Sequence, residues 1–171
     1  MTTTSPPFLS HIDQVCVVTR DLHRAMERYH TLLGMGPFQV YTFSAPRVKD
    51  MTYRGKPTDF AMKVAFTQYP TANGRLAFEL IEPIKGPTIY HEFLDRNHEG
   101  IQHFGVYVSN LDQAIEEARQ HGFEVIQSGR GYGTGGDGGF AYIGTEGELG
   151  AIFELIEAPA ERYAPEEVYP S

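Results

Sequence analysis

Two glutamates lie within a pentapeptide that occurs twice in the chain. Residues Phe78–Glu82 read FELIE, and the same five residues return as Phe153–Glu157. Glu79 and Glu154 are the second residues of the two copies, and apolar residues typical of strands surround them. Alternate residues of a strand face the same side, so each carboxylate lies either on an exposed face or in a polar site. Their matched positions favour a shared site.

A glutamine and a histidine occupy matched positions near the beginnings of the two halves. The segment VTRDL, ending at Leu22, is echoed by VSNL, ending at Leu111. Eight residues before Leu22 stands Gln14, and eight residues before Leu111 stands His103. Two matches in the same order indicate that the halves are related. We therefore expect Gln14 and His103 at equivalent places on the first strand of each half.

These four side chains form a donor set that suits a divalent cation. The two carboxylates carry two negative charges, which such a cation neutralises. Without it, two buried carboxylates would repel each other. Three oxygen donors and one nitrogen suit Zn, Ni, Co, Mn or Mg with one or two open water positions. The predicted metal ligands are Gln14, Glu79, His103 and Glu154.

Two other residues of metal-binding type stand outside this ligand set. His11 is three residues from Gln14, so on a strand it points to the opposite face. Cys16 is the only cysteine and lies in an apolar run, which favours a place in the core over a role as a nucleophile. It cannot form an internal disulfide, and a reducing compartment suits it.

The sequence pattern of each half predicts a strand, a helix and three further strands. In the first half, apolar residues recur at three- and four-residue spacing from Leu22 to Leu33, which indicates a helix that Gly34 ends. The first-half strands are predicted at 13–18, 38–43, 60–68 and 75–81. In the second half, Asn110 and Gln113 form a capping box for a helix that ends at Gly122. The second-half strands are predicted at 103–108, 124–127, 140–143 and 151–156.

These elements predict an α+β protein of two tandem βαβββ units. We assign the first unit to residues 10–83, a connector with a short helix near 90–95 to residues 84–100, and the second unit to residues 101–157. Residues 158–171 form a C-terminal arm, either ordered or frayed. Together they make one domain.

Composition limits the partners of the chain. The 171 residues are enough for one compact domain, and 14 Lys and Arg against 22 Asp and Glu give a net charge of −8 without a basic run. Nucleic acid is therefore not an expected partner. Met1–Phe8 show no basic region followed by an apolar core, and no apolar run reaches about eighteen residues, so we expect a cytoplasmic protein rather than a membrane protein.

Several of these segments resemble the vicinal oxygen chelate superfamily, which includes glyoxalase I, methylmalonyl-CoA epimerase, extradiol dioxygenases and antibiotic-binding proteins. The resemblance spans residues 10–157 and is greatest to the methylmalonyl-CoA epimerases. It rests on the strand that contains His103 and on the segments Ile12–Val15, Glu79–Pro83, Gly133–Gly136 and Ile152–Leu155. It implies that the two units pair into an open, half-barrel-like mixed sheet around one site.

The resemblance also implies a mechanism, in which the metal stabilises an enolate formed by proton removal next to a carbonyl or thioester. Glu154 would be both ligand and catalytic base. The leading expectation is an isomerase or epimerase-like enzyme, with a small-molecule substrate such as an acyl-CoA or a 2-oxo compound, and a homodimer as in many relatives. The weaker candidates for the substrate pocket are Lys63, Tyr107, Thr134, Gly135 and Gly136.

Two departures from the epimerase pattern keep alternatives open. The epimerases usually carry His at the position of Gln14, and the set found here resembles the metal ligands of eukaryotic-type glyoxalase I. The epimerases also use a second carboxylate base on the third strand, where this chain reads Ala61–Val64, so Lys63 or Asp59 would have to substitute. A glyoxalase I-like lyase, a metal-dependent dioxygenase and a non-enzymatic small-molecule-binding protein of the resistance type are the alternatives.

Overall fold

The computed structural model describes residues 9–96 and 98–171, so the prediction about Met1–Phe8 lies outside the described residues. The first half contains β1 (Gln14–Val18), α1 (Leu22–Leu33), β2 (Phe38–Phe43), β3 (Lys49–Tyr53), β4 (Lys56–Pro57), β5 (Ala61–Thr71) and β6 (Gly74–Lys85). The connector contains α2 (Ile89–Arg96). The second half contains β7 (Gly100–Tyr107), α3 (Leu111–Gln120), β8 (Val125–Arg130), β9 (Gly139–Ile143), α4 (Glu146–Leu149), β10 (Ile152–Glu157) and β11 (Glu167–Tyr169). None of the helices among the described residues has the length and apolarity that a membrane crossing requires.

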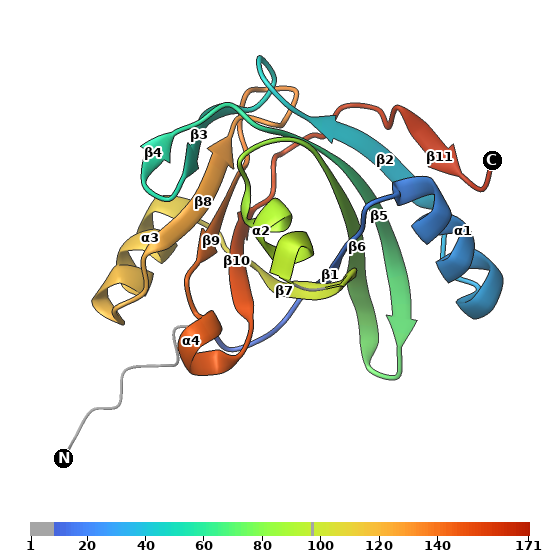
Figure 1. Ribbon diagram of the computed structural model, residues 1–171, viewed down its shortest axis with the longest axis horizontal. Helices are drawn as coiled ribbons and strands as arrows, with labels where there is room; N and C mark the ends of the chain where they lie inside the picture. The colour runs from blue at the N-terminus through green and yellow to red at the C-terminus, as the bar shows by residue number, and fades with distance from the viewer. Residues whose placement is uncertain (1–8, 97) are drawn as a thin grey trace.

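All strands join one curved, open sheet in the order β11-β2-β5-β6-β1-β7-β10-β9-β8-β3-β4 (Figure 1). At its centre β1 and β7 pair antiparallel, with Gln14 opposite Gly105. Outward from this pair, β6, β5 and β2 of the first half match β10, β9 and β8 of the second. β1 is parallel to β6, as β7 is to β10. The predicted α+β fold of two units around an open mixed sheet is confirmed.

The helices α1 and α3 lie outside the curve of the sheet, one on each half (Figure 1). Leu22 and Met26 of α1 pack with Leu80 of β6 in one apolar cluster. Leu111 of α3 packs with Leu155 of β10 in the matching cluster of the other half. The convex face of each unit therefore has its own core, built by an amphipathic helix on alternate strand residues.

The last glutamate of each FELIE copy binds the beginning of a helix. Glu82 Oε2 accepts a hydrogen bond of 2.8 Å from the backbone N–H of Leu22. Glu157 Oε2 accepts one of 2.6 Å from the backbone N–H of Leu111. A carboxylate at this place satisfies an unpaired N–H and favours the helix dipole. Each copy of the pentapeptide thus has two glutamates on opposite faces of the sheet. Glu79 and Glu154 lie on the concave face, whereas the helix-capping Glu82 and Glu157 lie on the convex face.

The helix α2 lies on the concave side of the sheet (Figure 1). Its Ile89, Tyr90 and Leu94 are buried in the largest apolar cluster of the described residues. The Tyr90 hydroxyl donates a hydrogen bond of 2.7 Å to the hydroxyl of Tyr142 on β9. The predicted connector helix therefore packs against the concave face of the half-barrel.

Each half also extends the sheet of the other, a feature that the sequence patterns did not predict. β3 and β4 follow the first-half strand β2, yet β3 pairs with β8 at the second-half edge. The C-terminal arm returns in the opposite direction, and β11 pairs with β2 at the first-half edge, with Val168 opposite Gln39 (Figure 1). The arm is therefore ordered, and it crosses the open side of the sheet between Glu157 and Glu167.

Candidate metal centre

The four predicted ligands lie on neighbouring central strands. In the order β6, β1, β7 and β10, these strands carry Glu79, Gln14, His103 and Glu154. All four side chains are buried, with exposed fractions of 5%, 1%, 0% and 5%. The parallel pairs place the glutamates at equivalent registers beside β1 and β7, so the internal symmetry brings the two halves together at one point.

Short distances connect the four side chains. Glu79 Oε2 and Glu154 Oε2 each lie 3.3 Å from His103 Nε2. Gln14 Nε2 lies 3.1 Å from the same Glu79 oxygen and 3.3 Å from the same Glu154 oxygen. One atom of each side chain therefore faces a common point. Their roles as ligands stay predictions.

The cluster fits a divalent cation. His103 Nε2 is buried and makes no hydrogen bond of good geometry among the described residues, although a carboxylate oxygen lies 3.3 Å from it on each side. Donor atoms about 2.0–2.2 Å from one cation lie roughly 3 Å apart, which is the separation seen here. A half-turn of the Gln14 amide would present its oxygen in place of its nitrogen. Donor type, burial and spacing thus agree with a metal held by these four residues.

Gly105 lies between two ligand strands and leaves room for the side chains beside it. It pairs with Gln14 on one side and with Glu154 on the other. A Cβ atom at Gly105 would lie 2.9 Å from the Cβ of Gln14 and 2.8 Å from the Cδ1 of Ile156. Contacts this short force neighbours to move. The missing side chain therefore leaves the space that the Gln14 side chain occupies.

A β-bulge adds one residue that sequence reasoning missed. The β1–β7 register runs from Cys16 opposite His103 to Val17 opposite Ile101, so Gln102 has no partner of its own. Gln102 is 5% exposed, and its Oε1 accepts a hydrogen bond of 2.5 Å from His103 Nδ1. This bond fixes the ring orientation with Nδ1 protonated and turns Nε2 toward the carboxylates. A bulge leaves no signal in the alternation of apolar residues.

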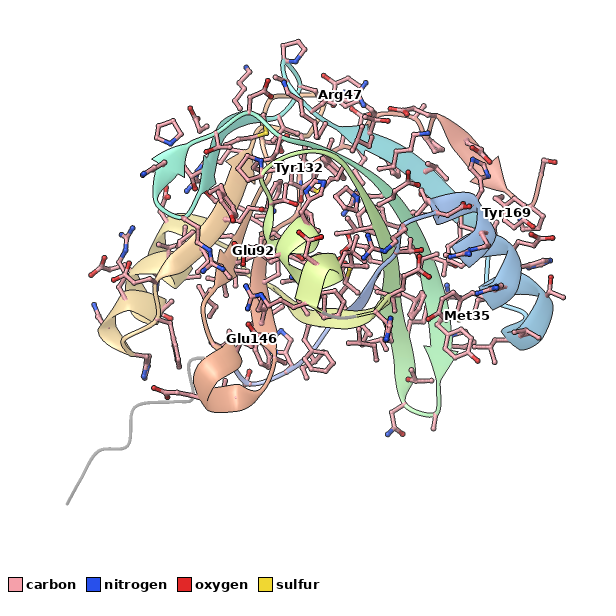
Figure 2. The ribbon with its side chains drawn as sticks, in the orientation of Figure 1. Met35, Arg47, Glu92, Tyr132, Glu146 and Tyr169 are labelled. Carbon is pink, nitrogen blue, oxygen red and sulfur yellow. The ribbon has the colours of Figure 1, made fainter. Side chains whose placement is uncertain are left out.

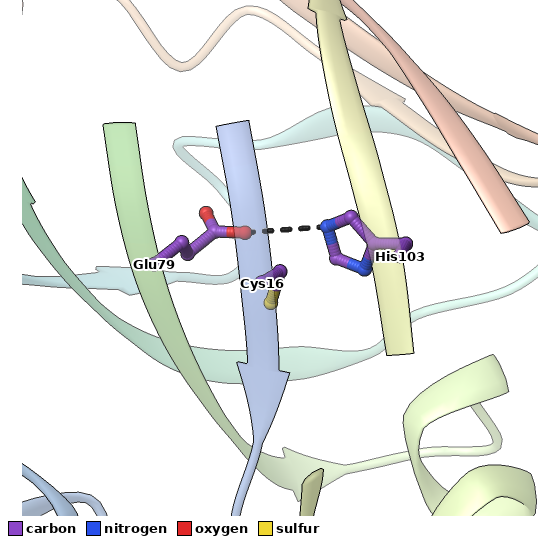
Figure 3. Close-up of side chains that lie close together, drawn as sticks. All are labelled: Cys16, Glu79 and His103. Carbon is purple, nitrogen blue, oxygen red and sulfur yellow. Dashed lines mark ion pairs between the residues drawn. The ribbon is translucent and has the colours of Figure 1, made fainter. Parts of the chain in front are cut away.

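Cys16 also belongs to this region. It shares the concave face with Gln14, and its sulfur lies with donor atoms of Glu79 and His103 in a group whose atoms are within 4.8 Å of one another (Figure 3). Burial, and then the charge of Glu79, raise the pKa of the Cys16 thiol well above its usual value. The thiol is therefore neutral in the metal-free protein and is not an activated nucleophile.

A protonated His103 offsets part of the carboxylate charge inside the cluster. Burial alone would lower the pKa of His103, but the neighbouring carboxylates of Glu154 and Glu79 outweigh it and raise this pKa to about 9. Burial raises the pKa of Glu79, while His103 opposes that change. The metal-free cluster thus holds a protonated imidazole where a metal would place its positive charge.

A small cavity of about 30 Å³ lies over the cluster. Aromatic and apolar side chains form most of its wall, and a single cation borders it. The lining residues are Gln14, Phe43, Met62, Phe66, Glu79, Tyr132, Phe140, Tyr142, Glu154, Ile156 and Arg162. Arg162 comes from the C-terminal arm, for which the sequence patterns predicted no function.

The predicted pocket residues do not line this cavity. Lys63 alternates with Met62, which lines the cavity, so its side chain lies on the other face of β5 and the expectation of a pocket role is not supported. Tyr107 lines an adjacent open cleft of about 520 Å³. Thr134, Gly135 and Gly136 line another cleft, of about 600 Å³, beside Arg47.

The glycine-rich loop binds the C-terminal arm. The backbone N–H of Thr134 donates to the backbone oxygen of Glu161 at 3.0 Å, and its hydroxyl donates to Glu161 Oε2 at 3.1 Å. Gly133 and Arg162 form an isolated antiparallel bridge. The contacts observed for this loop are thus with the protein's own arm rather than with the cluster.

A protein-family model identifies the superfamily to which this fold belongs. The chain belongs to the Glyoxalase/Bleomycin resistance protein/Dioxygenase superfamily, whose model matches residues 13–142. The predicted vicinal oxygen chelate membership is thereby confirmed. No curated protein matches the sequence.

Solved structures of methylmalonyl-CoA epimerases share this fold. A variant of the Streptomyces coelicolor enzyme in complex with 2-nitronate-propionyl-CoA is 20% identical, with a TM-score of 0.60, covering 91% of this chain and 99% of that one. The Mycobacterium tuberculosis enzyme is 22% identical, with a TM-score of 0.59 and coverages of 92% and 95%. A hypothetical protein from Bacillus halodurans C-125 is 17% identical, with a TM-score of 0.60 and coverages of 90% and 97%. The TM-scores and coverages show that these proteins share the fold of this chain.

Proposed function

We propose that this protein is a divalent-metal-dependent enzyme that moves a proton at the carbon next to a carbonyl or thioester, as an isomerase or epimerase does. The observation that supports this most is the buried cluster in which two carboxylates lie 3.3 Å from one histidine nitrogen. A divalent cation held by Gln14, Glu79, His103 and Glu154 would stabilise the negative charge that develops on the substrate oxygen. Zn, Ni, Co, Mn and Mg all suit this donor set.

Glu154 is the proposed catalytic base. Its carboxylate lines the cavity, and Oε2 lies 3.3 Å from Gln14 Nε2 and 3.3 Å from His103 Nε2. These contacts orient the carboxylate toward the space that a substrate would enter. Burial keeps bulk water away from the reacting carbon, so the carboxylate takes the substrate proton and can exchange it with solvent between turnovers.

A two-base exchange would use Glu79 as the second base. Lys63 faces away from the cavity, and Asp59 pairs with Lys85 at 2.5 Å on the exposed surface. Glu79 is the remaining carboxylate that lines the cavity, on the other side of His103 from Glu154. One carboxylate could then remove the proton from one side and the other could return it.

The proposed substrate is a small molecule of the acyl-CoA or 2-oxo class. Two features support this: the epimerase structures with the same fold include one with methylmalonyl-CoA bound, and an open cleft of about 520 Å³ adjoins the cavity. A homodimer and a cytoplasmic location are further parts of the proposal, and we expect no nucleic-acid partner for this acidic chain.

Proton exchange in deuterated water tests the proposed function. The metal-loaded protein should exchange the proton next to the thioester of methylmalonyl-CoA, followed by NMR, and Glu154→Gln should slow this exchange by about a hundredfold or more. Glu157→Gln is the matched control, because Glu157 lies on the same strand but binds the Leu111 N–H. Equal rates in Glu154→Gln and the parent would refute the role of Glu154.

A glyoxalase I-like lyase is the second candidate, because a glutamine, two glutamates and one histidine make up the cluster. The same protein should then convert the hemithioacetal of methylglyoxal and glutathione, which ultraviolet absorbance can follow. Turnover of the hemithioacetal without exchange in methylmalonyl-CoA would favour the lyase. The opposite result would favour the isomerase.

A further inference from the structure

The C-terminal arm brings a cation to the cavity. Arg162 is half-buried, and its guanidinium carbon lies 4.8 Å from the ring centre of Phe66 and 5.8 Å from that of Tyr132. Both rings also line the cavity over the cluster. Cation–ring contacts hold a guanidinium in place without neutralising it. Figure 2 labels Tyr132, one of the two rings that contact Arg162, inside the half-barrel, and Arg47 at its rim.

Among the described residues, no carboxylate pairs with this cation. Across residues 9–96 and 98–171, Arg162 takes part in no ion pair. The neighbouring arginine Arg47 has Glu166 at 3.7 Å, and the nearby acid Glu161 accepts from Thr134 instead. Arg162 thus presents its charge to the cavity with its hydrogen-bond donors available.

The arm is fastened on both sides of Arg162. Before it, Ala160 N–H donates to Asp137 Oδ2 at 2.6 Å. After it, the Glu166 carboxylate accepts from the backbone N–H of Thr42 at 3.0 Å and from its hydroxyl at 2.7 Å. A cation held by two fixed segments is preorganised for a ligand, which lowers the cost of ordering it on binding.

Arg162 also stands where a substrate would enter. Arg162 and Phe66 line both the small cavity and the open cleft of about 520 Å³ that contains Tyr107. A molecule that reaches the cluster from this cleft must pass the guanidinium. With a divalent cation balancing Glu79 and Glu154, Arg162 leaves the cavity with one excess positive charge.

We propose, on the basis of the proposed metal-dependent function, that Arg162 is a specificity-determining residue that binds an anionic group of the substrate, most simply a carboxylate, next to the reacting carbonyl. The planar guanidinium matches a carboxylate in two parallel hydrogen bonds. Substrates that carry a second acidic group are therefore preferred over neutral analogues of the same size.

Fumarate and crotonate are the matched probes. They share a four-carbon trans skeleton, and crotonate has a methyl group where fumarate has its second carboxylate. The trans double bond prevents both carboxylates of fumarate from binding one cation, so the second is free for Arg162. Calorimetric titration of the Zn-loaded protein with each acid yields the ratio of the two dissociation constants.

The parent protein should bind fumarate about tenfold or more tightly than crotonate, because a charge-assisted pair is lost in crotonate. Arg162→Met should bring the ratio close to one while metal content stays at the parent level, and Arg162→Lys should retain part of the preference. The control Arg119→Met removes the same charge from the exposed face of α3 and should leave the ratio unchanged.

Different failures have different meanings. A ratio that stays high in Arg162→Met, or one that is already near one in the parent, would overturn the role of Arg162 and leave the metal site intact. A loss of stability in Arg162→Met without a change in the ratio would show that Arg162 only packs the arm. A parent that takes up no metal would overturn the proposed function and this inference together.

Discussion

Glu79 and Glu154 place their Oε2 atoms at the same distance, 3.3 Å, from one nitrogen of His103. Each glutamate is the second residue of an identical pentapeptide, and each pentapeptide lies beside the first strand of its own half. Neither half alone could form this cluster. The internal duplication therefore explains why the two carboxylates converge.

The capping glutamates should contribute stability without affecting metal binding. We expect Glu82→Ala and Glu157→Ala each to lower the free energy of unfolding by about 1 kcal/mol, because each leaves a helix N–H without its acceptor. Urea denaturation measures this loss. Glu116→Ala, on an exposed position of α3, is the control and should be close to neutral. Loss of bound metal in the capping variants would contradict the division of tasks within the pentapeptide.

Gln102 should control metal affinity through the histidine ring. In Gln102→Ala the Nδ1–H of His103 loses its acceptor, so we expect a metal dissociation constant about 10–100-fold higher. Gln102→Glu keeps an acceptor and should bind metal at least as well as the alanine variant. Gln127→Ala is the control, since buried Gln127 accepts from the Ile89 N–H instead. Equal metal affinities in Gln102→Ala and the parent would exclude this role.

Metal binding near pH 7 should release about one proton. The pKa of His103 in the metal-free protein is about 9, whereas a ligand imidazole must be neutral. Apparent affinity should therefore rise with pH up to about 9. Titration calorimetry in buffers of different ionisation enthalpy measures the proton count, and heats that do not depend on the buffer would contradict the prediction.

The same pKa sets the pH dependence of stability without metal. The pKa of His103 is raised above its unfolded value of about 6.5, so this stabilisation is fully present below about pH 6.5 and is lost as pH rises through about 9. Thermal unfolding of the metal-free protein between these pH values should show the decline, with His103→Gln as the comparison that lacks it.

Gly105 should be required for the cluster. In Gly105→Ala the new methyl group meets Gln14 and Ile156, so we expect metal binding to weaken by roughly tenfold or more and stability to fall by about 1–3 kcal/mol. Gly147→Ala, where a Cβ meets nothing within 4 Å, is the control. Unchanged metal affinity in Gly105→Ala would show that the cluster tolerates a side chain there.

The elements and residues that the duplication repeats are predictable from the sequence. The strand and helix pairs of both units have the predicted type, and counting from Leu22 and Leu111 led to Gln14 and His103. Alternation along strands then predicted which residues share a face. These features are local, so spacing in the sequence is enough to find them.

The remaining features depend on contacts between distant segments. β3 (KDMTY) has no clear apolar alternation, and it becomes a strand by pairing with β8. Gln102 reaches the histidine through a bulge, and Arg162 has no counterpart in the other half. Cys16 was expected only in the core, and its place beside Glu79 follows from the pairing of β1 with β6.

Elemental analysis tests the central claim most directly. Protein purified without added metal or a chelating tag should contain about one equivalent of Zn, Ni, Co or Mn, or take it up on reconstitution, because a protonated His103 offsets only one of the two buried carboxylates and a divalent cation balances both. Glu79→Ala and Glu154→Ala should both lose it, while Glu157→Ala should keep it. A parent that holds no metal even after reconstitution would contradict the metal-dependent enzyme and favour a small-molecule-binding protein.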